Sequence, residues 1–239
     1  MSKNALNINN DYPNKPSRNE EVWVKHLYSY IQSTSPFDFM LKIYSARLPM
    51  IQTIQKFAER KKVIEIGCGN AMMSIILYKL GFDVVCTDLN EKVLDIAKQN
   101  ANSFNAEIDF VKVDMFDISS RFKYKEFDIV YSQGVLEHFE DEDIIKAIRA
   151  QNDIAKYVLI DVPSYFARNY PNLVGDERLM TFYAWKRIIK KTGLTIRYSY
   201  GRIDDKKWYI IKKIIPCGIA DFLNKYFCQN YGFLCSEKD

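Results

Sequence analysis

The sequence has no apolar run long enough to span a lipid bilayer, and its polar first 21 residues contain no signal-peptide core. Its five cysteines form no CxxC pair, and only His26 and His138 are present to complete a zinc site with them. Neither sign of charge dominates, because 34 basic residues are set against 30 acidic ones. We therefore expect no membrane insertion, no secretion, no structural metal and no nucleic-acid partner.

The overall amino-acid composition is typical of a folded globular protein. Hydrophobic residues make up 48% of the chain and charged residues 27%. Cys68 and Cys86 lie in apolar, strand-like segments, where a free thiol packs as a small hydrophobic group. Because free thiols are typical of a reducing compartment, we expect a cytoplasmic protein.

We expect one domain, preceded by a tail. Residues 1–19 are polar and lack apolar periodicity, which predicts a disordered segment. Residues 20–60 carry apolar side chains at helical spacing with a break near Ser35-Pro36, which predicts two helices. Because these helices are rich in aromatic residues, we expect them to cover the ligand edge of an α/β core, 61–239, as a lid.

Within this core, short β-branched runs alternate with helical stretches. The predicted strands are 63–66, 84–87, 108–113, 127–132, 157–162, 194–200 and 231–236. The predicted helices are 72–80, 91–104, 142–155, 184–192 and 206–227. This alternation predicts an α/β fold with a doubly wound, mostly parallel sheet of seven strands.

A glycine-containing turn follows the first predicted strand. Gly67 and Gly69 allow the backbone to approach a ligand where open α/β sheets bind their ligands. A dinucleotide fingerprint would need a glycine at Met72, and the chain has no phosphate-binding GxxxxGK loop. Glu65 places a carboxylate just before the turn, which favours an ammonium or sulfonium over a phosphate. The turn alone is also compatible with an ordinary strand-to-helix connection.

Two further acidic residues end predicted strands. Asp88 follows the glycines at the spacing from which an acidic side chain reaches ribose hydroxyls. Its alternative role is to cap the helix that starts at Glu91. Asp114 beside Met115 suggests a hydrogen-bond acceptor for an exocyclic amine next to an apolar cover for a flat base. Together these residues predict a nucleoside ligand.

Four segments thus occur in order: Glu65-Ile66-Gly67-Cys68-Gly69, Asp88, Asp114-Met115 and residues 127–139, FDIVYSQGVLEHF. They resemble the motifs of class I S-adenosylmethionine-dependent methyltransferases, and the broad small-molecule group that includes quinone-biosynthesis-like enzymes is the most similar. The resemblance covers about residues 61–162. It implies S-adenosyl-L-methionine as cofactor, a Rossmann-like fold and a final antiparallel strand at 231–236. It also implies the following cofactor-binding residues: Glu65, Gly67, Gly69, Asp88, Leu89, Asp114, Met115, Gln133 and Gly134.

The resemblance assigns these residues to parts of the cofactor. Glu65 and the glycine turn would hold the methionine moiety, with Gln133 and Gly134 beside it. Asp88 would hold the ribose, and Asp114 with Met115 the adenine. The sequence departs from the family pattern at Ala71, where the family often has a third glycine.

The acceptor side carries no decisive motif. Methyl transfer from a sulfonium is a direct displacement, so it needs a base only for weakly nucleophilic acceptors. The chain lacks the Asn/Asp-Pro-Pro-aromatic motif of enzymes that methylate nucleic-acid bases. His138 is the candidate catalytic base, and its alternative role is to pack or hydrogen-bond before the next helix. Residues 23–44 and 163–180, which include Asp176, are the candidate acceptor-binding segments.

The predicted function is therefore S-adenosylmethionine-dependent methyl transfer to a small-molecule acceptor, by O-, N- or C-methylation. Two alternatives stay open. One is an NAD-dependent oxidoreductase, against which Met72 and Glu65 argue. The other is a catalytically inactive protein that binds the cofactor and serves as a partner subunit.

Overall fold

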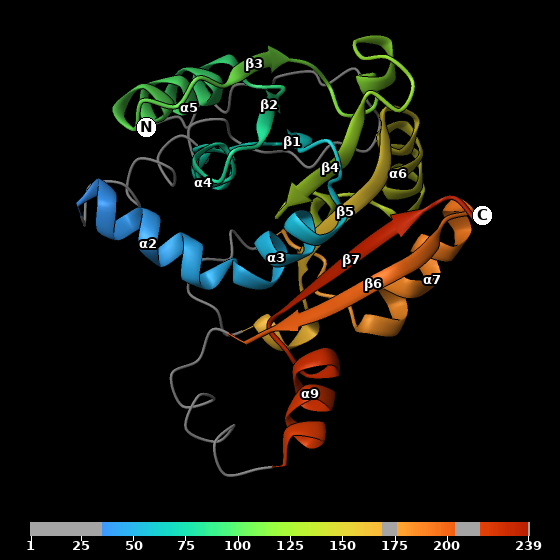
Figure 1. Ribbon diagram of the computed structural model, residues 1–239. Helices are drawn as coiled ribbons and strands as arrows, with labels where there is room; N and C mark the ends of the chain where they lie inside the picture. The colour runs from blue at the N-terminus through green and yellow to red at the C-terminus, as the bar shows by residue number, and fades with distance from the viewer. Residues whose placement is uncertain (1–34, 169–175, 204–215, 239) are drawn as a thin grey trace, which may run out of the picture.

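The computed structural model describes residues 35–168, 176–203 and 216–238, and its central feature is a sheet of seven strands (Figure 1). The strand order is β3-β2-β1-β4-β5-β7-β6. The predicted tail, 1–19, and the first predicted helix of the lid lie outside the described residues. The strands are β1 (Lys62–Ile66), β2 (Asp83–Asp88), β3 (Asp109–Lys112), β4 (Phe127–Gln133), β5 (Ala155–Pro163), β6 (Thr195–Arg202) and β7 (Asn230–Ser236).

The first five strands are parallel, and β7 runs antiparallel to both β5 and β6. This arrangement confirms the predicted doubly wound, mostly parallel sheet and its antiparallel last strand. The central strands are buried on both faces, as in β4, where all residues but the last are buried. Continuous burial explains why these strands read as apolar runs rather than as an alternating pattern.

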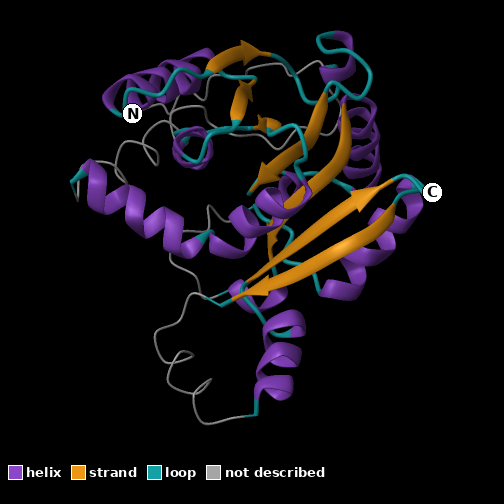
Figure 2. Cartoon of the chain, in the orientation of Figure 1, coloured by secondary structure: helices purple, strands orange, loops and turns teal. Residues whose placement is uncertain are grey.

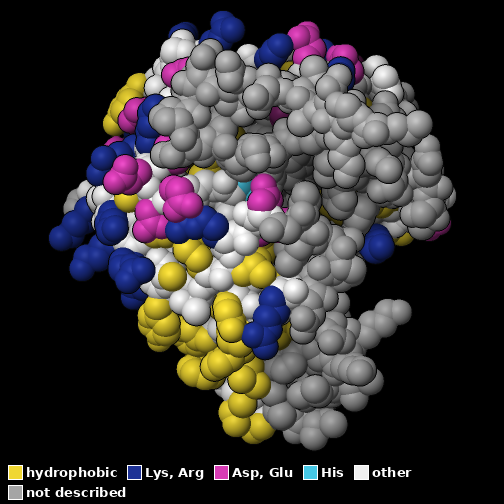
Figure 3. Space-filling view, turned by 180° about the vertical axis from the view of Figure 1, so that it is seen from behind, with side chains coloured by type: hydrophobic (Ala, Val, Ile, Leu, Met, Phe, Trp, Pro, Cys, Tyr) yellow, Lys and Arg dark blue, Asp and Glu magenta, His cyan; other side chains and the backbone are white. Residues whose placement is uncertain are grey.

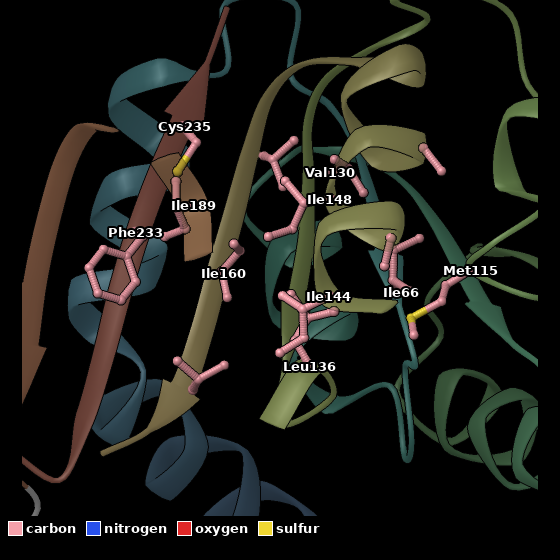
Figure 4. Packing of buried hydrophobic residues seen from close by; sticks show 14 of the residues in the cluster. Ile66, Met115, Val130, Leu136, Ile144, Ile148, Ile160, Ile189, Phe233 and Cys235 are labelled. Atoms are coloured by element: carbon pink, nitrogen blue, oxygen red, sulfur yellow. The ribbon is translucent and has the colours of Figure 1, made fainter. Parts of the chain in front are cut away.

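Helices cover both faces of the sheet (Figure 2). On one face, α3 and α4 pack on β1, β2 and β4, and α5 adds its apolar side to β2. On the other face, α6 and α7 pack on β4, β5 and β7, and Figure 4 shows Ile144 and Ile148 of α6 against Val130 and Ile160. The helices are α2 (Pro36–Ala46), α3 (Leu48–Phe57), α4 (Met72–Lys79), α5 (Glu91–Ser103), α6 (Asp141–Ile154), α7 (Phe182–Thr192) and α9 (Cys217–Tyr226).

The described helical segment before the sheet begins at Pro36 and is broken once, between α2 and α3. Ser35 caps α2 by accepting a hydrogen bond from the Asp38 backbone, and Pro36 is the first helical residue, so a helix begins at the predicted position of the break. The break at Arg47 separates α2 from α3 and was not predicted. Its cause is Pro49, which has no N–H to continue the hydrogen-bond ladder of α2.

The helix predicted at 206–227 is observed only from Cys217, after Pro216, because 204–215 lie outside the described residues. Figure 3 shows hydrophobic side chains gathered on the surface near this helix, where Ile219, Phe222 and Phe227 are exposed. In the part of the chain that the structure describes, no helix has the length and apolar character needed to cross a bilayer.

Candidate cofactor and acceptor site

The carboxyl ends of the five parallel strands meet at one edge of the sheet, and the glycine turn follows β1 at this edge. Gly67, Gly69 and Ala71 have positive φ angles of 65°, 53° and 57°. The alternation of left-handed residues folds the turn tightly before α4. The Cys68 backbone N–H donates to the Thr87 carbonyl over 3.0 Å, which attaches the turn to the end of β2.

Ala71 shows why the family pattern has a glycine at this position. The left-handed conformation costs about 1–2 kcal/mol for a residue with a Cβ and almost nothing for glycine. Ala71 is completely buried and acts as the N-cap of α4 without a side-chain capping bond. The departure from the pattern therefore keeps the backbone path of the turn and adds local strain.

The connection after β4 lies directly against the glycine turn. A Cβ added to Gly67 would stand 2.7 Å from Val135 Cγ2, so only glycine fits between the two segments. Gly134 also has a positive φ, 66°, and its N–H donates to the Asp161 carbonyl at 3.0 Å. The structure thus places Gly67 against Val135, the residue that follows Gln133 and Gly134, although the two segments lie far apart in the sequence.

Asp88 ends β2 beside the turn. Its carboxylate accepts a hydrogen bond from the Asn90 backbone at 2.9 Å. Burial raises the pKa of the Asp88 carboxyl, and the backbone N–H groups of Asn90, Gly69 and Leu89 lower it in part. The side chain that caps α5 is Asn90, which accepts from the Lys92 and Val93 backbones. Asp88 is therefore not the helix cap, and the alternative role considered for it does not hold.

The Asp114 and Met115 pair follows β3, next to the end of β2. The Val113 N–H donates to the Asp88 carbonyl at 3.1 Å, and the Asp114 carboxylate accepts from the Phe116 backbone at 3.0 Å. Met115 is only 8% exposed and belongs to the main core cluster, where Figure 4 shows it next to Ile66. Much of the Met115 side chain therefore serves core packing. Leu89, by contrast, is exposed.

Glu65 is buried under α4, with 4% of its surface exposed. Its carboxyl accepts hydrogen bonds from Ser74 at 2.5 Å and from Tyr131 at 3.2 Å. Burial is the largest effect on this group and raises the pKa of Glu65 to about 8, although the two hydrogen bonds act in the opposite direction. Glu65 is thus largely protonated at neutral pH unless a cation lies beside it.

His138 occupies η2 (Leu136–His138), a short helical turn that follows Val135. Its Nδ1 lies 3.1 Å from the Asp176 carboxylate, and its Nε2 lies 3.7 Å from the Glu137 carboxylate. His138, Asp176 and Glu177 each place one polar atom within 4.8 Å of the others. The sequence places Asp176 in a candidate acceptor segment, but it does not reveal that Asp176 meets His138.

Residues 63–156 match the model of a methyltransferase domain family. This part of the chain is similar to the domain of S-adenosylmethionine-dependent methyltransferases. The match covers the glycine turn, Asp88, Asp114 and η2, and it confirms the family expected from the motifs. The architecture of the domain agrees, because a SAM-dependent methyltransferase from Archaeoglobus fulgidus superposes with a TM-score of 0.58. That alignment has 15% sequence identity and covers 85% of this chain and 100% of the other.

Two curated relatives are similar to this chain over less than half of its length. The ubiquinone biosynthesis O-methyltransferase of Bordetella avium is 27% identical over 117 residues, which are 48% of this chain and 48% of the relative. The ribosomal protein L11 methyltransferase of Dictyoglomus turgidum is 38% identical over 69 residues, which are 28% of this chain and 23% of the relative. The chain therefore spans less than half the length of either relative.

Proposed function

We propose that this protein transfers a methyl group from S-adenosyl-L-methionine to a small-molecule acceptor. The observation that carries the proposal is the position of the Asp88 carboxylate at the end of β2, in contact with the backbone of the glycine turn. This is the point of the sheet where an acidic side chain can accept hydrogen bonds from the two hydroxyls of a ribose. The matched methyltransferase domain supports the same ligand.

The described residues suggest how the cofactor is held. Gly67 and Gly69 leave room for the methionine moiety beside Gln133 and Gly134, and Asp88 binds the ribose. A bound sulfonium and ammonium would favour the ionised form of Glu65, whose pKa burial raises to about 8. The cofactor supplies an activated methyl group, and the protein contributes alignment and exclusion of water.

Both alternatives to this function make different predictions. An NAD-dependent oxidoreductase needs space for a pyrophosphate at the start of α4, where Met72 is buried. An inactive partner protein would bind the cofactor without turnover. The L11 methyltransferase relative makes a protein acceptor the alternative to a small molecule.

We further propose a cytoplasmic location and no nucleic-acid partner, in keeping with the free buried thiols of Cys68 and Cys86 and the balanced charge.

The experiment is a calorimetric titration with S-adenosylhomocysteine. Asp88→Ala removes a charged acceptor of two hydroxyl groups and is expected to weaken binding by about 1.5–3 kcal/mol. The matched control is Asp95→Ala, an exposed residue of the adjacent helix α5 that forms an ion pair with Lys98. An unchanged dissociation constant in folded Asp88→Ala, or tighter binding of NAD than of S-adenosylhomocysteine, would contradict the proposal.

A second measurement separates an enzyme from a binding protein. The protein is incubated with S-adenosylmethionine labelled in the methyl group and with extracts divided into small molecules and proteins. We expect label in the small-molecule fraction, and less of it with Asp88→Ala at a low concentration of S-adenosylmethionine. Label in protein alone would change the acceptor class, and tight cofactor binding without any transfer would favour the inactive partner protein.

A further inference from the structure

The connection between β5 and α7 is fastened to η2 by Arg178. The Arg178 backbone N–H donates to the Glu137 carbonyl at 2.8 Å. The guanidinium donates to the Phe139 carbonyl and, at 2.7 Å, to the Asp141 carboxylate. These bonds hold the residues beside Arg178 against His138, although the two segments lie far apart in the sequence. The arrangement is therefore built by several contacts and does not depend on one flexible side chain.

The His138 ring lies between two carboxylates within this arrangement. The side chain is 4% exposed, and 3.1 Å between Nδ1 and the Asp176 carboxylate is a hydrogen-bond distance. A carboxylate can only accept, so this bond places the imidazole proton on Nδ1 and leaves Nε2 as the basic nitrogen. The Glu137 carboxylate, at 3.7 Å from Nε2, is too far for a hydrogen bond but close enough to stabilise a positive ring.

The basic nitrogen lies on the side of η2 where Glu137 approaches Gly134. The Glu137 carboxylate that neighbours Nε2 stands 3.5 Å from the position a Cβ would take on Gly134. Val135, between them in sequence, contacts Gly67 of the turn. Nε2 is thus on the side of η2 where the proposed function places the reacting end of the cofactor.

We infer that Asp176 positions His138 as a proton acceptor and that the methyl acceptor is therefore a hydroxyl group. This inference rests on the proposed function. The acceptor O–H gives its proton to Nε2 while the oxygen forms a bond to the methyl carbon. The bond between that carbon and the sulfonium sulfur breaks, and its electron pair stays on sulfur. The products are a methyl ether, neutral S-adenosylhomocysteine and an imidazolium that passes its proton to water.

The charges around His138 suit this step. The carboxylates of Glu137, Asp176 and Glu177 face the ring and stabilise the imidazolium, whereas burial opposes it. The guanidinium of Arg178 is held by the Phe139 carbonyl and Asp141. An amine that is already neutral, or a thiolate, would need no such proton acceptor.

The first test is an NMR titration of the imidazole resonances, which the presence of only two histidines makes simple. His26→Gln assigns the His138 signals, and their ¹⁵N shifts report the tautomer. We expect the proton on Nδ1 in the native protein. Asp176→Asn keeps an acceptor oxygen but removes the charge, so the apparent pKa of His138 should fall by about one pH unit. Asp176→Ala should also change the tautomer, and the control Glu142→Gln at an exposed position on α6 should change neither.

Three outcomes would overturn the inference. In the first, the pKa and tautomer of His138 are the same in the native protein and in both Asp176 variants. In the second, micromolar Zn²⁺ or Mg²⁺ shifts or broadens the His138 signals in the native protein and not in Asp176→Asn, which would make the cluster a metal site. In the third, labelled methyl groups from the donor go to amines, thiols or carboxylic acids, and not to phenols, in a panel of these four classes.

Cofactor affinity distinguishes a failure of this inference from a failure of the proposed function. S-adenosylhomocysteine should bind His138→Gln and Asp176→Asn within about twofold of the native protein, because neither residue is proposed to contact the ribose or adenine. Where an acceptor is found, His138→Gln should slow the single-turnover step by about 10²–10⁴-fold, the usual contribution of a positioned base. Asp176→Asn should slow it less and move its pH profile.

Discussion

Replacing Glu65 by glutamine tests the consequence of burying a carboxyl group under α4. Burial raises the pKa of Glu65 from 4.5 to about 8, so the folded protein holds a proton that the unfolded chain releases above pH 4.5. Between these two pKa values, each increase of one pH unit lowers the free energy of unfolding by about 1.4 kcal/mol. The contribution of the protonated Glu65 carboxyl to the free energy of unfolding is fully present below pH 4.5 and is lost as the pH rises through 8.

The expected magnitude follows from this linkage. Between pH 5 and pH 8 the native protein should lose about 3 kcal/mol from Glu65 alone. Glutamine has no ionised form and keeps one oxygen to accept from Ser74 and Tyr131. The unfolding free energy of Glu65→Gln minus that of the native protein should therefore rise by about 3 kcal/mol over this range.

Urea unfolding of both proteins at several pH values, without cofactor, measures this difference. The matched control is Glu107→Gln at an exposed position, which should change stability by less than about 0.5 kcal/mol at every pH. A difference for Glu65→Gln that is constant from pH 5 to pH 8 would refute the reasoning. It would mean that the hydrogen bonds from Ser74 and Tyr131 keep the buried carboxyl ionised.

Two further predictions concern packing and the segment before the sheet. A Cβ on Gly232 would stand 2.0 Å from the buried Tyr200 ring, so Gly232→Ala should lower the free energy of unfolding by about 1–3 kcal/mol or more. Gly218→Ala, where a Cβ meets nothing within 4 Å, should not destabilise the protein in the same urea experiment, and equal effects would contradict the packing argument. Deleting residues 1–16 should change little, whereas deleting 1–36 should impair acceptor turnover more than binding of S-adenosylhomocysteine if these residues form a lid. Equal loss of both properties would count against the lid.

The sequence predicts the order of the elements because each depends on a local signal. Strand β1, predicted at 63–66 and observed at Lys62–Ile66, is a short apolar run, and the glycines after it mark a turn. The acidic residue Asp88 can be recognised because it ends the next such run. Since parallel strands end at the same edge, these local signals are sufficient to predict that Gly67, Gly69 and Asp88, the proposed cofactor-binding residues, lie close together.

The rest of the site depends on contacts between distant segments, which local patterns do not encode. Glu65 meets Tyr131 across 66 positions, so its protonated state at neutral pH follows from tertiary burial rather than from the motif. Asp176 lies beside His138 where Arg178, two residues later, binds the Glu137 carbonyl of η2. A sequence pattern shows that both residues are present, but it cannot show that they meet.

The position of β7 has a consequence for synthesis of the protein. Strand β7 lies inside the sheet, between β5 and β6, although it comes last in the chain order. While the chain is being made, β5 has an open edge and β6 has no neighbour until residues 230–236 leave the ribosome. Open strand edges are sites of association with other chains. A chain that stops before residue 230 therefore exposes the edge of a five-stranded parallel sheet, and it is expected to aggregate rather than to fold with slightly lower stability.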